Sequence, residues 1–293
     1  MTSPLRRIPD RADIVSVRVS SRFDVEVMRT WFRTQTFPRH THPYFTVGVM
    51  SRGAGTLWVG GVTRVLLPGD VVVISPADVH TGGLGAGNDV LSYTALHVPP
   101  ELITQCAESQ GLPGSTAEGI GSFVVRDQAI AAQLRRVDRA MEGARDMAEA
   151  ESAIVGALDL LVALRRASSE SPPEPRRREA PAFVGIARAI IEDCYADAER
   201  TSLDGLASVA GVTPFHLVRE FTRAMGLSPH RYVIQTRVRR ASELLAKGLP
   251  VSDVAATVGF ADQSHLTTQF RRYVGTTPAS YQRSLRCELL RDE

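Results

Sequence analysis

Two copies of one residue pattern, displaced by 48 or 49 positions, occupy the last third of the chain. Ala207 and Gly211 recur 48 residues later as Ala255 and Gly259. Five more residues recur 49 residues later, namely Leu217, Phe221, Gly226, Pro229 and Tyr232 as Leu266, Phe270, Gly275, Pro278 and Tyr281. Seven matches with a single inserted residue favour two copies of one structural unit over two unrelated helical hairpins.

Each copy contains, in order, the parts of a helix-turn-helix. In the first copy, Ser202 and Thr213 are suited to cap helices, and Gly211 supplies the positive φ of the tight turn between them. In the second copy, Gly259 forms the turn and Asp262 caps the helix that follows. The pattern therefore predicts two helix-turn-helix units in tandem, an arrangement that reads the major groove of DNA.

One long helix is predicted between the two units. Its apolar residues recur at helical spacing through 229–247: Tyr232, Ile234, Val238, Ala241, Leu244 and Leu245. A helix of about 19 residues is about 30 Å long, close to the ~34 Å that separates successive major grooves on one face of DNA. The connecting helix is therefore expected to hold both units in step on one duplex without a second copy of the chain.

The first half of the chain has a different texture. Residues 14–125 alternate short apolar runs with Gly and Pro turns, which is typical of a β-sandwich or barrel. We predict an α+β multidomain protein, with an N-terminal β-barrel, cupin-like domain carrying appended helices and a C-terminal all-α domain. The predicted divisions are a sensor domain at 1–126 and a helical segment at 127–167, followed by a Pro- and Arg-rich linker at 168–182 and a DNA-binding domain at 183–293.

The helical segment carries an apolar stripe with two possible uses. Ile154, Leu158, Leu161, Val162 and Leu164 follow helical spacing between charged residues. Such a stripe outside a barrel forms either the contact of a homodimer or a packing surface against the barrel itself. The spacing does not favour one use over the other.

The positive charge of the chain is concentrated near its C-terminus. Residues 200–291 contain thirteen Lys and Arg against six Asp and Glu, whereas residues 1–199 contain 21 against 24. Binding of a polyanion such as DNA requires this distribution. No apolar run approaches the roughly 18 residues of a membrane helix, the N-terminus lacks an apolar signal segment, and the three cysteines are scattered. These features predict a cytoplasmic protein that does not enter a membrane.

Three stretches of the C-terminal region resemble the DNA-binding domain of the AraC/XylS family of bacterial transcription regulators. They are residues 226–232, 237–241 and 254–266, and the likeness extends over 183–285. The resemblance implies that double-stranded DNA and RNA polymerase are partners. Most members of this family activate transcription, so it also implies an activator.

The resemblance assigns base-reading positions to the second helix of each unit: Phe215, His216, Val218, Arg219, Gln263, Ser264, His265, Thr267 and Thr268. Arg219 is suited to a bidentate pair with guanine and Gln263 to adenine, each worth about 1–3 kcal/mol of discrimination. The family often has Arg where Thr268 stands, so the second unit is expected to read its half-site less strongly. Further arginines are expected on phosphates, with solvated surface as the alternative for each: Arg223, Arg271 and Arg272.

A His-x-His pair, His40 and His42, precedes a predicted strand, and His80 begins a later one after the Pro-Gly-Asp turn at 68–70. Residues 15–100 resemble the cupin-type sensor domain of the same family. Side chains two positions apart on a strand share one face, so both histidines are expected to enter the barrel. Three imidazoles are suited to Zn, Ni or Fe, but residues 44–50 lack the carboxylate that metal-bearing cupins usually supply.

We therefore favour a small effector over a metal or cofactor, with structural histidines as a further alternative. The expected effector contacts, through hydrogen bonds to a carboxylate or hydroxyl, are His40, His42, Tyr44, His80 and Tyr93. Trp58 and His97 are weaker candidates, and Trp58 is expected in the barrel core.

The sequence is consistent with three functions. The favoured one is a DNA-binding transcription regulator, not an enzyme, controlled by a small molecule in the barrel. The first alternative is a metal-dependent cupin enzyme fused to a DNA-binding domain. The second is an architectural DNA-binding protein without an effector, against which the polar second reading helix counts.

Overall fold

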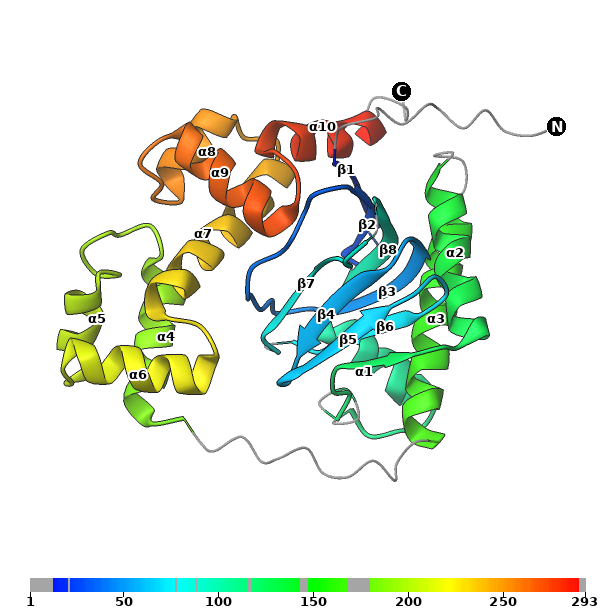
Figure 1. Cartoon of the computed structure of the whole chain (residues 1–293), viewed down its shortest axis with the longest axis horizontal. Helices are drawn as coiled ribbons and strands as arrows, with labels where there is room; N and C mark the ends of the chain where they lie inside the picture. Colours follow the sequence, from blue (N-terminus) through cyan, green and yellow to red (C-terminus); the bar gives the residue numbers. More distant parts are fainter. Residues whose placement is uncertain are drawn as a thin grey trace.

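The computed structural model describes residues 13–20, 22–76, 78–87, 89–114, 117, 119–142, 147–167 and 180–289. Most of the predicted linker at 168–182 lies outside these residues. The fold is α+β, with a β-sheet domain flanked by helices and a helical C-terminal domain beside it (Figure 1). No helix in the described part of the chain is long and apolar enough to cross a membrane.

The N-terminal domain contains two antiparallel sheets. The six-stranded sheet has the order β1 (Ile14–Ser20), β2 (Val25–Phe32), β8 (Leu91–Val98), β3 (Phe45–Arg52), β6 (Val71–Ile74) and β9 (Phe123–Val125). The three-stranded sheet has the order β5 (Val62–Leu66), β4 (Gly55–Val59) and β7 (His80–Leu84). Apolar side chains of both sheets share one buried cluster, which lines the space between them. The predicted short strands of 14–125 therefore form a two-sheet enclosure.

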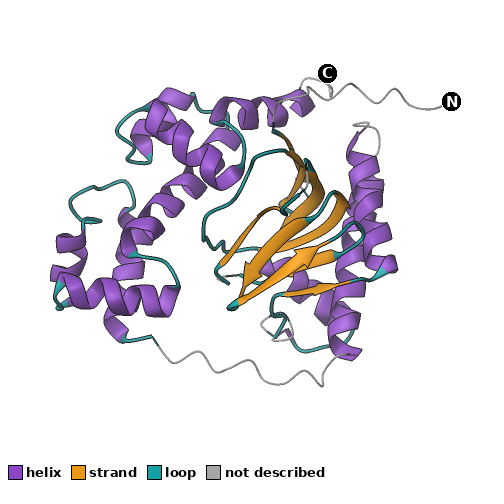
Figure 2. Ribbon diagram, in the orientation of Figure 1, coloured by secondary structure: helices purple, strands orange, loops and turns teal. Residues whose placement is uncertain are grey.

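Helices cover the other face of the large sheet: α1 (Pro100–Ser109), α2 (Gln128–Glu142) and α3 (Met147–Ala167) (Figure 2). The apolar stripe of α3 lies in this layer, and Ile154, Leu158, Leu161 and Val162 are fully buried there with residues of the sheet. Of the two uses left open for the stripe, the structure shows packing against the sheet. A homodimer contact through these residues would require the layer to come apart.

The C-terminal domain consists of α4 (Ala182–Cys194), α5 (Leu203–Ala210), α6 (Pro214–Met225), α7 (Pro229–Ala246), α8 (Val251–Thr257), α9 (Gln263–Val274) and α10 (Pro278–Leu289). The predicted caps are present, because the side chains of Ser202, Thr213 and Asp262 accept hydrogen bonds from backbone N–H groups of α5, α6 and α9. Gly211 and Gly259 have φ values of 68° and 81°. These local signals explain why each helix begins and ends where it does.

The internal repeat is also a repeat of packing. Phe221 and Tyr232 meet edge to face with ring centroids 5.6 Å apart, and Phe270 and Tyr281 repeat this contact at 5.4 Å. Arg237 of α7 ties the units together, because its guanidinium donates to the carbonyl oxygens of Tyr195 and Gly259 at 2.7 and 2.6 Å. Half-buried carbonyls at the end of α4 and in the turn of the second unit thereby gain hydrogen-bond partners.

Candidate DNA-binding surface and effector pocket

The first reading helix, α6, buries Leu217 and Phe221 and turns its other face outward. Phe215 is 78% exposed, and the side chain of Arg219 is 60% exposed. Glu220 accepts from Arg219 Nε at 3.2 Å and from Arg223 Nε at 2.8 Å, and these bonds, chiefly the one from Arg223, lower the pKa of its carboxyl group. Glu220 therefore holds both guanidinium groups on the outer face of α6.

The second reading helix, α9, has a less charged face over its first two turns. Gln263, Ser264 and Thr268 are exposed, and the Thr268 hydroxyl donates to the Ser264 carbonyl at 3.0 Å. His265 is half-buried, with its ring edge-on to Phe260 at 5.0 Å between centroids. The outward positions in the first two turns of α9 therefore offer uncharged polar side chains rather than a cation.

The remaining residues predicted to contact DNA differ in how exposed they are to solvent. Arg271 and Arg272 are exposed at the end of α9, whereas His216, Val218 and Thr267 are half-buried. His216 packs against Phe183 with ring centroids 5.1 Å apart. All predicted positions lie on α6 or α9, and the least accessible of them are those nearest the helix packing.

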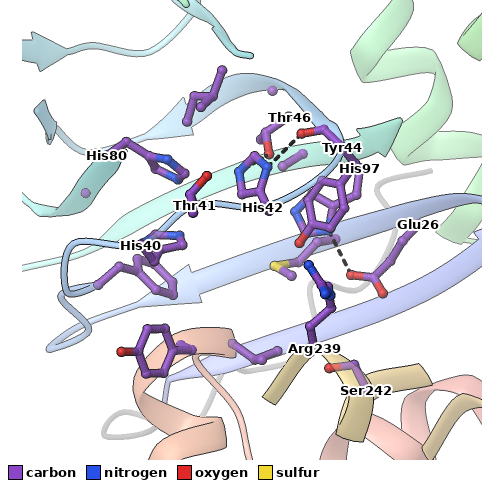
Figure 3. Close-up of a pocket in the computed structure, with 18 of the residues that line it drawn as sticks. Glu26, His40, Thr41, His42, Tyr44, Thr46, His80, His97, Arg239 and Ser242 are labelled. Atoms are coloured by element: carbon purple, nitrogen blue, oxygen red, sulfur yellow. Dashed lines mark hydrogen bonds and ion pairs between the residues drawn. The ribbon is translucent and has the colours of Figure 1, made fainter. Parts of the chain in front are cut away.

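A cavity of about 950 Å³ lies between the two sheets and the C-terminal domain. All five predicted effector residues line it, namely His40, His42, Tyr44, His80 and Tyr93 (Figure 3). His97 also lines it, whereas Trp58 does not. Trp58 is half-buried, and the Arg39 guanidinium lies over its ring at 4.2 Å, so the expectation that Trp58 joins the core was wrong. The volume is within the range of small-molecule sites.

The histidines reach the cavity by a different route from the one predicted. Residues 40–42 are not a regular strand, because the segment stands between Pro38 and Pro43, which lack N–H donors for a ladder. Instead His40 forms a single bridge with His80, through backbone N–H···O bonds of 3.0 and 2.9 Å. The bridge brings the two rings to 4.1 Å between centroids, and the His42 ring is 4.8 Å from that of His80.

All three rings are held uncharged by their surroundings. Burial lowers the pKa of His40 to about 4 and that of His80 to about 3. Burial and the neighbouring His80 keep the pKa of His42 well below its usual range. Loss of hydration disfavours the charged ring, so the cavity presents neutral imidazoles at neutral pH.

The donor set does not fit a metal ion. Nε2 of His42 lies 3.1 Å from the Thr46 hydroxyl, which uses the lone pair that a metal would need. Within the described ranges no group of three or more His, Cys, Asp or Glu residues has a metal-binding arrangement. The three histidines are therefore better suited to hydrogen bonding than to metal coordination.

A second end of the cavity carries stacked rings and a carboxylate. The Tyr44 ring stacks between those of His42 and His97, at 4.4 and 4.3 Å between centroids. His97 Nδ1 is 3.0 Å from Glu26 Oε1, and Tyr281 of α10 donates its hydroxyl to Glu26 Oε2 at 2.7 Å. Burial opposes ionisation of Glu26, but the hydrogen bond and charge interaction with His97 hold its pKa below the ordinary value.

The C-terminal domain supplies a wall of the cavity that was not predicted from the sequence. Arg239 of α7 lines the cavity while paired with Glu192, and Gln235 of α7 grips the barrel segment between the histidines. The Gln235 amide accepts from the Thr41 N–H at 3.0 Å and donates to the Thr41 carbonyl at 2.5 Å. No local pattern marks these residues, because their role depends on how the two domains dock.

Two family models match this chain. One, described as an AraC-like ligand binding domain, covers residues 22–158. The other, described as a helix-turn-helix domain, covers residues 206–284. The chain belongs to the AraC family of transcription regulators. It is thus a DNA-binding regulator with an effector-binding N-terminal domain, in a family that is not enzymatic.

Relatives share nearly the whole AraC-type architecture. The HTH-type transcriptional regulator YbfI of Bacillus subtilis is 27% identical over 86% of this chain and 89% of its own length. The HTH-type transcriptional activator RhaS of Escherichia coli is 26% identical, over 83% and 86%. Crystal structures of ToxT from Vibrio cholerae have the same fold. The unsaturated fatty acid-bound form has a TM-score of 0.53 at 13% identity, covering 94% of this chain and 96% of ToxT.

Proposed function

We propose that this regulator activates transcription, and that a small molecule in the interdomain cavity sets how the second helix-turn-helix unit is held. The observation that carries the proposal is the shared lining of the cavity, with His40, His80 and Tyr44 on one side and Gln235 and Arg239 on the other. A ligand that contacts both domains stabilises one docking arrangement over others. The name of RhaS as an activator supports the direction of the effect.

Two contacts would carry the effect of the ligand to the DNA-binding domain. The Gln235 amide holds Thr41, whose neighbours in the chain are the cavity histidines His40 and His42. At the other end, Tyr281 of α10 binds Glu26, which pairs with His97. A ligand that moves the histidines or the stacked rings therefore acts directly on α7 and α10.

On DNA, we propose that α6 and α9 enter successive major grooves, with α7 as the spacer. Eighteen residues of α7 span about 27 Å, and the two reading helices lie near its opposite ends (Figure 1). The positions proposed to contact bases and phosphates are those assigned by sequence: Phe215, His216, Val218, Arg219, Gln263, Ser264, His265, Thr267, Thr268, Arg271 and Arg272. One copy of the chain carries both units, so the proposal requires no dimer.

The test begins with the full chain and a pool of randomised DNA, from which a binding sequence is selected. That sequence is then placed upstream of a weak promoter and transcribed with purified bacterial RNA polymerase. We expect the amount of transcript to increase with added protein. The size of this increase should differ in Gln235→Met, which keeps the side-chain volume but removes both hydrogen bonds to Thr41. The exposed Gln128→Met on α2 is the matched control. Failure to select a sequence, or an unchanged or reduced transcript, would contradict the proposal.

A further inference from the structure

Two imidazoles in the cavity are fixed in one tautomer by their backbone partners. Nδ1 of His40 lies 2.8 Å from the carbonyl oxygen of Pro38, and Nδ1 of His80 lies 2.9 Å from that of Asp78. A carbonyl oxygen accepts hydrogen bonds and cannot donate, so each Nδ1 must carry the hydrogen. In a neutral ring Nε2 is then left with a lone pair and acts only as an acceptor.

The cavity leaves both of these acceptors open. Among the described residues, neither Nε2 has a hydrogen-bond partner, whereas Nε2 of His42 already accepts from Thr46 at 3.1 Å. Both rings line the cavity, and Figure 3 shows them near each other, beside Thr41. The double backbone bridge between His40 and His80 holds the rings 4.1 Å apart. The pair is therefore a preformed site for two neighbouring donors.

A carboxylate is poorly matched to this pair. Its oxygens only accept, and two lone pairs facing it would repel it. Burial keeps both rings uncharged, since it lowers the pKa of each far below neutrality. Two cations line the cavity, and one of them, Arg239, is already paired with Glu192. The second is Lys247, and it is outnumbered by the carboxylates of the lining: Asp24, Glu26, Glu101 and Glu243. The charges facing the cavity give no net pull on an anion.

Much of the wall formed by the sheets is apolar. The cavity is lined on the sheet side by Met50, Leu57, Leu66, Val72, Ile74 and Leu91. Phe37 stands beside the pair, with its ring 6.0 Å from that of His40. A ligand that fills this space gains by burying apolar surface, at roughly 25 cal/mol per Å². Its body is therefore expected to be hydrocarbon-like rather than polar throughout.

We propose that the effector is an uncharged molecule with an apolar body that donates two neighbouring hydroxyl hydrogens to Nε2 of His40 and Nε2 of His80. This inference rests on the proposed function, because it identifies the chemical class that the interdomain cavity takes. It also decides between the two groups expected from the sequence, in favour of hydroxyl over carboxylate.

The test uses a pair of probes with the same apolar chain, 1,2-decanediol and decanoate, titrated calorimetrically into the full chain at neutral pH. We expect the diol to bind at least about tenfold more tightly, the equivalent of one or two hydrogen bonds. His40→Asn and His80→Asn keep an amide N–H near the position of Nδ1 and remove the acceptor, so each should weaken diol binding about fivefold to tenfold. The exposed His230→Asn is the matched control.

Glutamine variants guard against misfolding as an explanation. His40→Gln and His80→Gln return an acceptor to the position of Nε2 and should restore most of the diol affinity. Tighter binding of decanoate, no binding of the diol, or equal diol affinity in all variants would overturn the inference. If the diol binds as expected but leaves DNA binding and transcription unchanged, the proposed function is wrong although the inference about the ligand class holds. If decanoate instead changes transcription, the function stands and the inference falls.

Discussion

The two helix-turn-helix units are alike inside and different outside. The buried contact of Phe221 with Tyr232 is repeated by Phe270 with Tyr281. Yet the first unit has a core cluster of its own, whereas the core of the second is continuous with the inner cluster of the sensor domain. The difference indicates that the repeat alone does not assign roles. The sensor domain is built against the second unit, and that unit is the one whose position it can set.

The sensor domain also makes different contacts with the two helix-turn-helix units. Toward the first unit, Gly226 approaches Val79, and a side chain there would meet Val79 Cγ2 at 2.6 Å. Toward the second unit, Gln35 donates to the carbonyl oxygens of Arg271 and Arg272 at the end of α9, both at 3.3 Å, and Tyr281 binds Glu26. The second junction thus has several hydrogen bonds, and it also has the shared core.

The largest effect should come from emptying each core in turn. Phe270→Ala and Phe221→Ala each remove a fully buried ring, which costs about 3–5 kcal/mol of the free energy of unfolding. Hydrogen exchange should show faster exchange confined to α4–α6 in Phe221→Ala. In Phe270→Ala it should extend into β1 and β2. The same spread in both variants would show that the two cores are not separate.

Low pH should destabilise the sensor domain, which contains His40 and His80, before it destabilises the first helix-turn-helix unit. His40 and His80 have an ordinary pKa of 6.5 when unfolded, and about 4 and about 3 when folded. Because the unfolded chain binds these protons first, stability is lost as the pH falls from about 6.5 toward these folded values, at about 1.4 kcal/mol per pH unit for each ring. Thermal unfolding measured from pH 7 to pH 5 tests this. His40→Asn should flatten the slope, and an unchanged slope would contradict the assignment.

The reading helices should contribute unequally to DNA affinity. Arg219→Ala removes the α6 cation that is assigned to a base, leaving Arg223 in place, and should cost about 1–3 kcal/mol of specific binding while relaxing selectivity at one base pair. Gln263→Ala should cost less, since α9 offers no exposed cation among its first residues. Titration of labelled operator DNA measures both, with the exposed Arg64→Ala on β5 as the control. A greater loss in Gln263→Ala would reverse the proposed order.

The smallest effect should come from the hydroxyl that joins α10 to the sensor domain. Tyr281→Phe keeps the ring against Phe270 but removes the donor to Glu26, which retains His97 as a partner. The change should cost about 0.5–1.5 kcal/mol, the usual net contribution of one hydrogen bond. The equivalent change in the first unit, Tyr232→Phe, removes a bond to Glu192 within the DNA-binding domain. Only Tyr281→Phe should alter the response of DNA binding to a cavity ligand.

Local features of the fold were predictable, and long-range ones were not. The caps at Ser202, Thr213 and Asp262 and the turn at Gly211 depend on neighbouring residues, so the sequence carries them directly. One wall of the cavity was predictable for a similar reason, since short motifs carry its histidines. The other wall comes from α7, where the residue Gln235 acts only after the domains dock.

Two further expectations show where the sequence was ambiguous or misleading. The stripe at Ile154 and Leu158 has the same spacing whether it packs on a sheet or on another chain, and only the fold shows that it is buried. The pair His40 and His42 reached the cavity without forming a strand, because Pro38 and Pro43 interrupt the ladder.

The central claim is that the sensor domain acts on the second unit and not on the first. Hydroxyl-radical footprinting of a selected operator, with the full chain and with Gln235→Met, tests it most directly. We predict that the half-site bound by α6 is protected at the same concentration of either protein. The half-site bound by α9 should be protected at a different concentration of Gln235→Met than of the unsubstituted chain. Equal shifts at both half-sites, or none at either, would contradict the claim.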